Sequence, residues 1–287
     1  PIASSGEEDT HDYSHLQFLF DGIRTNSSKA KESHNPESVL PTFGIDSESL
    51  SSARHSIKHT KSSVADKTQS GAWLAQINRV WLAVRCFNPK SPAPTSHLQD
   101  DALSIELCID GHDIFVDPGT GVYTSNPNVR NQMRSRSHHS TAGPTQESDI
   151  DSDEMFDLPM KGITSVAQST ASRFSGMYET DSWKLQREVE LSANGLTIND
   201  AFESNQSWQQ VFVLHPKIRV QSNSESDSPN MKLEWSGSGT AIEIISSNGK
   251  IRCEDGTYSP HYGIIVPTKR LIINHGTVDS NLVTINI

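Results

Sequence analysis

Residue types that transfer protons or bind anions and metals gather in one short stretch, residues 96–141, of this 287-residue chain. Histidine exchanges protons near neutral pH, and arginine binds a carboxylate through two parallel hydrogen bonds. The candidates are His97, Gln99, Asp101, Asp117, Tyr123, Arg130, Arg134, His138 and His139. Such a set suits proton transfer next to an anionic group.

A β-hairpin is predicted to position these residues. Apolar residues alternate with others over residues 102–109, which is the period of a strand with one apolar face. Asp110-Gly111 follows, and this dipeptide favours a type I′ turn, which needs positive φ at both positions. The return strand is residues 112–116. A two-residue turn then pairs Ile109 with His112, Leu107 with Ile114, and Ile105 with Val116.

The predicted register also decides which side chains share a face. It leaves Asp117 beside Ser104, on the more polar face of the hairpin. His97 and Asp101 reach the same end of the hairpin, and Tyr123 follows the turn after Asp117. A histidine, carboxylates and a tyrosine are therefore expected at one sheet edge, within reach of the arginine- and histidine-rich loop that follows.

Three motifs in this stretch resemble one known family. They are S-H-L-Q-D-D-A-L-S-I at residues 96–105, V-D-P-G-T-G-V-Y at 116–123 and R-S-R-S-H-H-S-T at 134–141. L-Q-R-E-V-E-L at 185–191 and Y-S-P-H-Y-G at 258–263 add to the likeness. Together they resemble the C-terminal domain of the heparinase II/III-like polysaccharide lyases, from about residue 71 to the end of the chain.

The resemblance implies cleavage of a uronate-containing glycan by β-elimination. This reaction needs a group that neutralises the substrate carboxylate, a base for the C5 proton and an acid for the leaving oxygen. The resemblance implies catalytic roles for His97, Tyr123 and Arg134. It implies substrate contacts for Asp101, Arg130 and His138.

Each of the three catalytic candidates also has a structural alternative. The alternative for His97 is a histidine on a surface loop. Tyr123 could pack against the preceding turn. Arg134 could form an internal salt bridge to Asp117 or Glu147.

The family also carries a zinc ion in this domain, and the resemblance implies that Gln99, Asp117 and His139 stand at the ligand positions. Zinc prefers imidazole, thiolate or carboxylate, so glutamine is a poor ligand. His138 is a substitute candidate, but neighbouring residues of an extended chain point in opposite directions. A site held by hydrogen bonds from Gln99 is the alternative to a metal.

Composition limits the partners. The net charge of −11 argues against nucleic acid as a partner, so contacts with a polyanion must be local, as at Arg130, Arg134 and Arg136. The three cysteines lack metal-binding or redox spacing, and Cys108 is predicted to be a buried free thiol. No apolar run is long enough to span a membrane.

Two regions are predicted. Residues 1–70 are polar and serine-rich, and S-G-E-E-D-T-H-D at 5–12 resembles the end of the helical toroid domain that precedes the sandwich in the family. We therefore expect residues 1–70 to be the tail of a missing helical domain plus a linker. Residues 71–287 are predicted to be all-β and to form a large antiparallel β-sandwich.

The predicted strands are short and are separated by turn signals, including Asn194-Gly195, Asn248-Gly249, Asp255-Gly256 and His275-Gly276. They cover residues 73–77, 81–87, 182–191, 196–201, 209–214, 217–220, 232–236, 241–246, 250–253, 263–266, 270–274 and 281–287, in addition to the hairpin. Residues 125–155 are predicted to be a long polar loop, and loops of that length are often functional.

Two functions are consistent with these patterns. The first is the β-sandwich of a lyase for an acidic polysaccharide, such as a glycosaminoglycan or an alginate-like polymer, with a second wall of the cleft supplied by the helical domain. The chain alone is then expected to be inactive, and a periplasmic or secreted location is favoured. The second is a non-catalytic sandwich that binds glycan or supports assembly.

Overall fold

Residues 64–287 form one compact unit in the computed structural model. The structure describes residues 71–88, 98–146, 150, 158, 161–221, 228–236, 241–276 and 278–287, together with the backbone of strand β1 (Ser62–Lys67). His97, Glu147 and residues 1–61 lie outside the described residues.

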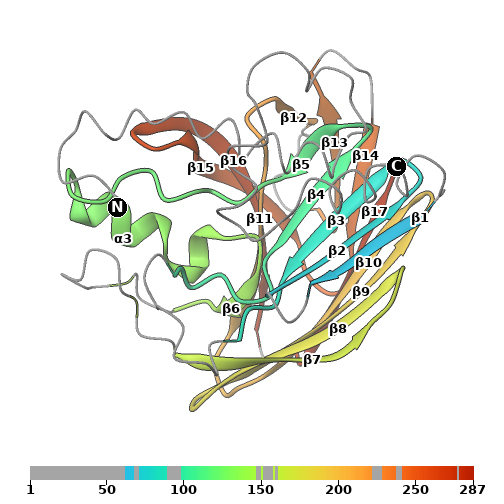
Figure 1. The fold of residues 1–287 in the computed structure, drawn as a ribbon, viewed down its shortest axis with the longest axis horizontal. Coiled ribbons are helices and arrows are strands. Elements are labelled where there is room, and N and C mark those ends of the chain that lie inside the picture. Colours follow the sequence, from blue (N-terminus) through green and yellow to red (C-terminus); the bar gives the residue numbers. More distant parts are fainter. Residues whose placement is uncertain are drawn as a thin grey trace, which may run out of the picture. The chain divides into compact units, whose positions relative to one another are not determined.

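One layer of the fold is an eight-stranded antiparallel sheet (Figure 1). Its strands, in spatial order, are β12 (Ile218–Gln221), β13 (Asn230–Trp235), β14 (Ala241–Ser246), β17 (Ser280–Asn286), β10 (Gly195–Glu203), β9 (Lys184–Ser192), β8 (Arg173–Thr180) and β7 (Gly162–Ser169). Buried and exposed residues alternate along β9 and β14, so these strands bury one face and expose the other.

The other two sheets are smaller. A five-stranded sheet has the order β1, β2 (Ala72–Ile77), β3 (Val80–Arg85), β4 (Ile105–Ile109) and β5 (His112–Phe115). A four-stranded sheet has the order β15 (Ile251–His261), β16 (Ile264–His275), β11 (Trp208–Val213) and β6 (Ala142–Pro144). A single bridge, Phe115 to Leu214, joins the two smaller sheets.

The core lies between the eight-stranded sheet and the smaller sheets. Trp73 of β2 and Phe174 of β8 bring their ring centroids within 5.6 Å across this interface, and Phe115 stacks on Phe212 at 5.0 Å. One continuous hydrophobic cluster includes buried residues from all three sheets. Because this burial removes apolar area from water on both inner faces, it is the main stabilising contribution. The predicted antiparallel β-sandwich is confirmed.

Most predicted strands are present, with boundaries within a few residues. Two predicted strands, 263–266 and 270–274, are parts of the single strand β16. The turn predicted at Asp255-Gly256 is wrong, because both residues pair with β16 in the middle of β15. Strands β1, β6, β7 and β8 were not predicted, and β1 lies within residues 1–70, which were expected to be a tail and linker.

The hairpin of β4 and β5 confirms the turn and corrects the register. Asp110 and Gly111 have φ values of 53° and 78°, as a type I′ turn requires, and Ile109 pairs with His112. A β-bulge then pairs Leu107 with Phe115, so the predicted pairing of Leu107 with Ile114 is wrong.

The pairing of Ile105 with Val116 is wrong as well. The amide of Ile105 donates to the Ser140 carbonyl, and the amide of Val116 donates to the Val213 carbonyl. Strand β5 thus leaves β4 after Phe115 and joins the four-stranded sheet, which moves Asp117 away from Ser104.

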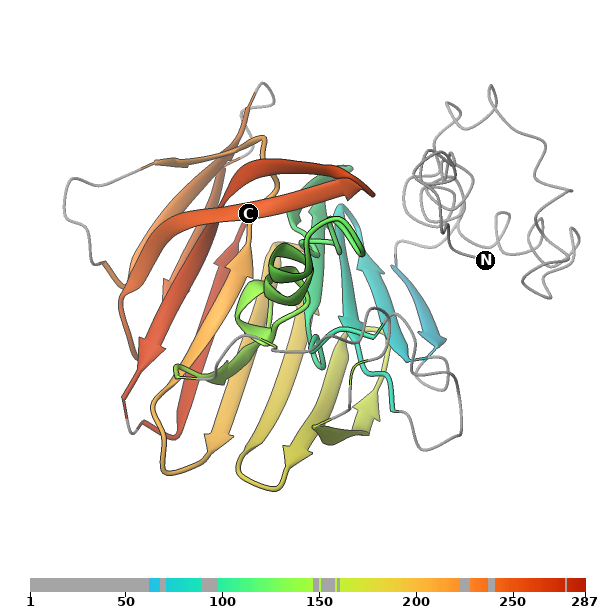
Figure 2. The same cartoon turned by 90° about the vertical axis from the view of Figure 1, so that its left-hand side faces the viewer.

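The predicted long loop contains regular structure. It holds helix α3 (Pro127–Met133), a 3₁₀ turn η6 (Arg136–His138) and strand β6. The Asn126 side chain accepts from the Val129 amide and caps the helix, and Pro127 occupies its first turn. Figures 1 and 2 show α3 and the β15–β16 hairpin at the same end of the sheets.

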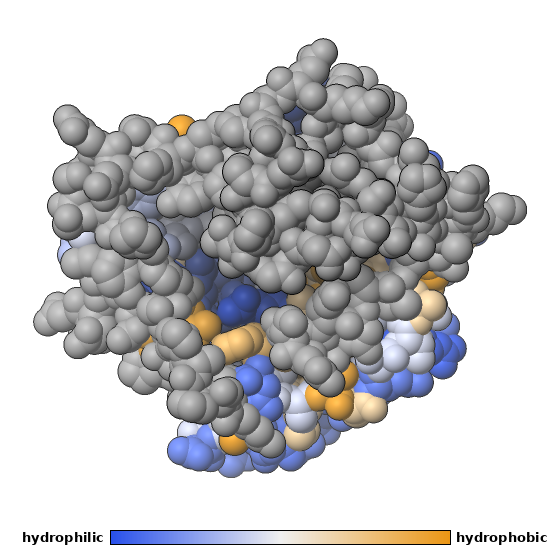
Figure 3. Space-filling model, in the orientation of Figure 1, coloured by the Kyte–Doolittle hydropathy of each residue, from blue (hydrophilic) through white to orange (hydrophobic). Residues whose placement is uncertain are grey.

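Hydrophobic and hydrophilic residues mix on the coloured surface in Figure 3. Among the described residues, the large exposed hydrophobic side chains are Ile163, Ile264, Ile265, Val278 and Leu282. No helix in the described part of the chain is long and apolar enough to cross a bilayer.

Candidate functional site

The turn after β5 fixes the carboxylate of Asp117. Its Oδ1 accepts the amide hydrogen of Gly119 at 2.9 Å, closing a local turn. Gly119 has a φ of 75°, and a side chain there would lie 2.6 Å from the Ser259 carbonyl. The Ser259 amide donates to the Pro118 carbonyl at 2.8 Å. Glycine is therefore required for the turn to lie against β15.

His139 reaches the same carboxylate from the other side. It follows η6, its side chain is fully buried, and its Nδ1 lies 2.9 Å from Asp117 Oδ2. Burial alone favours the neutral imidazole, but the carboxylates of Asp117, Asp101 and Asp100 outweigh it and raise the pKa of His139. The two residues thus form a charge-assisted pair.

The same interaction acts on Asp117. Burial disfavours its ionised form, yet the positive imidazolium, its hydrogen bond and the Gly119 amide hold the pKa of Asp117 below the usual value. Asp117 is therefore ionised at neutral pH and cannot act there as a proton donor.

Asp101 is the second carboxylate of this cluster. Its side chain is mostly buried, and Oδ1 accepts from Arg85 Nε at 2.7 Å. Burial raises the pKa of Asp101, and the charges of Arg85 and His139 offset this only in part. Asp101, Asp117 and His139 interact electrostatically, so the structure brings these three predicted site residues together.

Gln99 approaches the turn from residues 98–101. Its Nε2 donates to Thr120 Oγ1 at 3.0 Å. Gln99 Oε1 and His139 Nε2 are both buried, and neither forms a hydrogen bond with another described residue. Two buried polar atoms at the site thus have a hydrogen-bonding position that a buried water molecule can fill.

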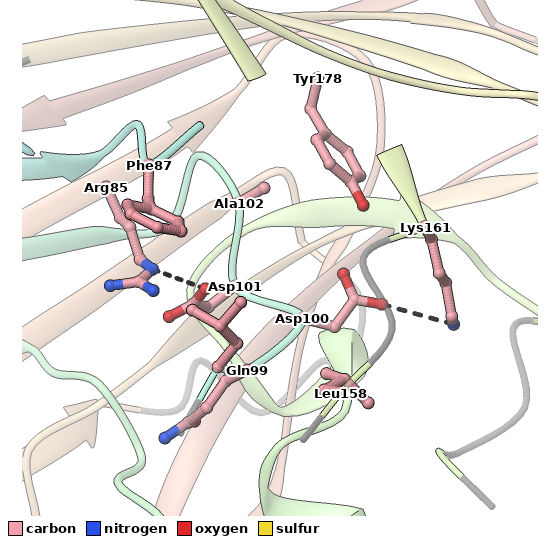
Figure 4. Close-up of a pocket in the computed structure, with 10 residues that line it drawn as sticks. Arg85, Phe87, Gln99, Asp100, Asp101, Ala102, Leu158, Lys161 and Tyr178 are labelled. Atoms are coloured by element: carbon pink, nitrogen blue, oxygen red, sulfur yellow. Dashed lines mark hydrogen bonds and ion pairs between the residues drawn. The ribbon is translucent and has the colours of Figure 1, made fainter. Parts of the chain in front are cut away.

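A pocket opens beside Gln99 and Asp101 (Figure 4). Among the residues that line it are Arg85, Gln99, Asp100, Asp101, Lys161 and Tyr178. Asp100 lies 3.4 Å from Lys161 Nζ, and Figure 4 shows this ion pair and the Arg85–Asp101 pair on opposite sides of the pocket. The pocket is small, about 10 Å³, and Phe87, Leu98 and Leu158 also line it, so it has room for a water molecule at most.

Helix α3 positions two further candidates, Arg130 and Arg134. Arg130 Nε and Arg134 Nη2 both donate to Asn131 Oδ1, at 3.1 and 2.9 Å. Both guanidinium groups are buried, and burial, reinforced by repulsion from Arg130, lowers the pKa of Arg134. Arg130 and Arg134 thus place two buried guanidinium groups side by side at one end of α3.

Tyr123 lies next to these arginines. Its carbonyl accepts from Arg130 Nη1 at 3.3 Å, and its ring stacks on Tyr262 of the β15–β16 hairpin with centroids 5.4 Å apart. Its amide donates to the Tyr262 hydroxyl at 3.4 Å. The Tyr123 ring therefore packs on the β15–β16 hairpin, whereas the alternative expected from the sequence was packing against the preceding turn.

Arg136 does not have the expected role as a surface contact for a polyanion. Its guanidinium is buried, donates to Asp100 Oδ1 and to the carbonyl groups of Ala142 and Ala102, and lies 4.9 Å from the ring centroids of both Tyr178 and Trp183. Its donors are used internally, so its function is structural.

His138 is half-buried, with Nδ1 3.1 Å from Ser137 Oγ. It points to a different partner from that of His139, as expected for adjacent residues. Cys86 and Cys108 are buried free thiols, which confirms the prediction for Cys108, and Cys253 is exposed.

Comparisons with known proteins identify the family. The model of the heparinase II/III-like C-terminal domain matches residues 60–285. The chain belongs to this family. No curated protein matches its sequence significantly.

Solved structures of this heparinase-like chain's relatives share its fold. The heparan sulfate lyase HepC from Pedobacter heparinus superposes with a TM-score of 0.63 at 15% identity, covering 96% of this chain and 42% of that one. A heparinase III structure gives 0.64 at 16% identity, covering 95% and 41%. The chain thus spans about two fifths of the length of these relatives.

A third solved structure is that of a glucanotransferase. The 4-alpha-glucanotransferase of Thermococcus litoralis gives a TM-score of 0.52 at 8% identity, covering 98% of this chain and 51% of that one. Since one sandwich fold serves different chemistries, function must be argued from the site.

The heparinase-like family implies zinc, and the residues present do not fit a tetrahedral zinc site. Asp117 Oδ2 and His139 Nδ1 bond to each other, and Asp117 Oδ1 accepts from Gly119. The third position, Gln99, offers only an amide. No group of three histidine, cysteine, aspartate or glutamate residues in the described part of the chain is arranged to hold a metal.

Sequence reasoning assigned no role to two buried charged residues of the eight-stranded sheet, one of which bonds to the backbone of the site. Arg187 of β9 and Asp200 of β10 are fully buried and face each other across the two strands. A signal was present, because Arg187 shares its strand face with Leu185, Val189 and Leu191. Arg187 lies on the apolar face of β9, and Asp200 lies opposite it on the apolar face of β10. A basic and an acidic residue at facing positions of two apolar strand faces predict a buried ion pair.

Proposed function

We propose that this heparinase-like chain is the β-sandwich part of a lyase that cleaves an acidic, uronate-containing polysaccharide by β-elimination. The observation that supports this best is the cluster of Asp101, Asp117 and His139, because the family motifs that carry these residues meet in space. Family membership and the structural likeness to a heparinase III and a heparan sulfate lyase are consistent with it.

The chemistry asks for three roles. We propose that Arg134, with Arg130 beside it, neutralises the uronate carboxylate, since two neighbouring guanidinium groups favour an anion. We propose that His97 and Tyr123 transfer the protons, and that Asp101 and His138 contact the sugar. The Asp117–His139 pair holds the two motifs in contact, which lets residues from both act on one sugar.

We further propose that the predicted tail and linker, residues 1–70, joins the sandwich to a helical domain, with its residues 62–67 forming strand β1 of the five-stranded sheet. That domain would supply the other wall of the cleft and further catalytic groups. The chain's coverage of 41 to 42% of its relatives leaves room for such a domain in a longer protein. The activity then needs both walls, because base, acid and neutralising group must reach the same sugar.

A non-catalytic glycan-binding or assembly role is the second candidate. The observation that favours it is Gln99, whose amide stands where the family pattern has an imidazole and donates to Thr120 Oγ1. Binding of an acidic glycan without formation of an unsaturated product would support this role.

The experiment compares His97→Ala with the unchanged protein, both in a protein that includes the preceding domain. Formation of the unsaturated uronate is followed by its ultraviolet absorbance. Loss of general acid–base help predicts a fall in turnover of at least about 100-fold. His112→Ala, at the far end of the β4–β5 hairpin, is the matched control and should keep its turnover. Turnover of His97→Ala equal to that of the control removes His97 from the reaction.

A further inference from the structure

We propose that Arg187 and Asp200 form a positioning pair that sets the geometry of the Asp101–Asp117–His139 cluster. This inference rests on the proposed function for its catalytic consequence, but its structural part can be tested without any substrate. Arg187 lies in the motif L-Q-R-E-V-E-L at residues 185–191, but the family resemblance assigned it no role at the site.

The pair is closed and completely buried. Arg187 Nε lies 2.7 Å from Asp200 Oδ1, and Arg187 Nη2 lies 2.6 Å from Asp200 Oδ2. Both side chains have no exposed surface. Gln210 Nε2 adds a third bond to Asp200 Oδ2 at 2.8 Å. The guanidinium plane is therefore fixed, with Nη1 directed away from the carboxylate.

That remaining nitrogen bonds to the backbone of the site. Arg187 Nη1 donates to the Leu103 carbonyl at 2.6 Å and to the Ser140 carbonyl at 3.2 Å. Leu103 follows Asp101 by two residues, and Ser140 directly follows His139. One guanidinium group thus joins the two segments that carry the acid and the imidazole.

Leu103 needs this support. Its φ of 61° is in the left-handed region, which a branched aliphatic residue rarely adopts. The Leu103 amide donates to the Arg85 carbonyl while its own carbonyl accepts from Arg187. Both backbone polar groups are therefore bonded, which holds a conformation that the residue would otherwise avoid.

Ser140 extends the connection to Asp117. Its hydroxyl donates to the Val116 carbonyl at 3.3 Å and accepts the Val213 amide at 3.0 Å. Val116 directly precedes Asp117. A displacement of Ser140 would therefore move both partners of the Asp117–His139 pair.

Packing alone does not explain why Arg187 and Asp200 are charged residues. Replacing a buried ion pair by well-packed apolar residues is often neutral or stabilising, because burying two charges costs desolvation energy. Apolar residues could fill the space of Arg187 but could not hold two carbonyl oxygens. Orientation of the backbone at the site is the property that only the arginine supplies.

The test uses the full chain and the double variant Arg187→Met/Asp200→Asn. Methionine fills the arginine stem, and asparagine keeps an acceptor for Gln210. The readout is the NMR signal of the His139 imidazole N–H, assigned by its loss in His139→Gln and recorded with a chelator present. We expect the signal to shift or to broaden from exchange with water while the protein stays folded. Arg173→Met/Glu190→Gln, which removes an exposed pair of the same sheet, should leave it unchanged.

Other outcomes decide the proposal as well. An unchanged His139 signal in the folded double variant overturns it. If the double variant does not fold, Arg187→Lys replaces it, since lysine keeps the charge but cannot bond Asp200 and two carbonyls together. Failure of that variant to fold would make Arg187 purely structural and also overturn the proposal.

The catalytic consequence is measured separately. In a protein that includes the preceding domain, the double variant should lose about 100-fold in kcat, the effect of misplacing a reacting group by about 1 Å. The KM should stay nearly constant, because the substrate contacts are not removed. A shifted signal in a protein without lyase activity would keep this inference and reject the proposed function.

Discussion

The imidazole of His139 and the carboxylate of Asp117 meet at 2.9 Å although 22 residues separate them in the chain. A glycine turn presents the carboxylate, and a 3₁₀ turn presents the imidazole. The contact closes the loop that contains Tyr123, Arg130 and Arg134. This hydrogen bond therefore holds together the two ends of the loop that carries two of the three candidate catalytic residues.

Removing the carboxylate should destabilise the fold. Asp117→Ala leaves His139 Nδ1 buried and unbonded, so we expect a loss of about 2 kcal/mol in the free energy of unfolding. Asp117→Asn keeps an acceptor oxygen and should lose less. Urea unfolding measures both. Glu190→Ala, which removes only an exposed ion pair with Arg173, should change the value by less than about 1 kcal/mol. Equal effects of Asp117→Ala and Glu190→Ala would contradict this assignment.

His275 should make the fold sensitive to acid. Burial, only partly offset by Asp200, lowers the pKa of His275 from 6.5 to about 4. Between these two values the unfolded chain binds a proton that the folded chain does not, so stability falls as the pH drops from 6.5 towards 4. The expected loss is about 3 kcal/mol.

Urea unfolding at several pH values measures this loss. Its matched variant is His275→Gln, which keeps a donor for Gln210 Oε1 and lacks the titrating group. That variant should lose less stability over the same pH range. Identical pH profiles for the two proteins would show that His275 is not the titrating group.

The zinc prediction can be tested by restoring the missing ligand. Purified protein should hold no stoichiometric zinc after dialysis, because the site offers one imidazole, one carboxylate and one amide. Gln99→His supplies a second imidazole and should gain zinc, as measured by metal analysis. The gain should disappear in Gln99→His/His139→Ala. Stoichiometric zinc in the unchanged protein would show that Gln99 does not prevent binding.

Arg136 should tolerate no replacement. Arg136→Lys keeps the charge but loses the planar group that lies against Tyr178 and Trp183 and bonds several oxygens at once. We expect a loss of about 3 kcal/mol in the free energy of unfolding. Arg173→Lys on the exposed face is the control and should be close to neutral. If Arg136→Lys lowered the free energy of unfolding as little as Arg173→Lys does, the Arg136 side chain would not be part of the core.

Local signals were sufficient for much of the fold. Asp110-Gly111 predicted the hairpin turn, since few other dipeptides adopt positive φ at both positions. The β-bulge after this turn could not be predicted from nearby residues. It accompanies the bridge between Phe115 and Leu214, two residues that lie far apart in the sequence. Strand β7 was missed because several of its residues are exposed, which weakens the alternation.

The site shows the same division. The motifs identified Asp117 and His139, whose contact the structure contains. Arg136 was expected at the surface, because a segment rich in arginine is usually exposed to solvent. Its aromatic partners, Tyr178 and Trp183, lie far away in the sequence, so their contact with Arg136 is visible only in the structure. Arg187 was missed for a related reason, since its role depends on carbonyl groups of residues far away in the chain.

The lyase proposal is tested most directly by the product formed from an acidic polysaccharide. A protein that contains this chain together with the preceding helical domain is expected to form unsaturated uronate ends, seen as rising ultraviolet absorbance. Residues 1–287 alone should be slower by orders of magnitude, because they provide one wall of the cleft. Robust turnover by residues 1–287 would contradict the two-walled cleft. Binding of uronate polymers by the longer protein, with no unsaturated product from any of them, would contradict the lyase function itself.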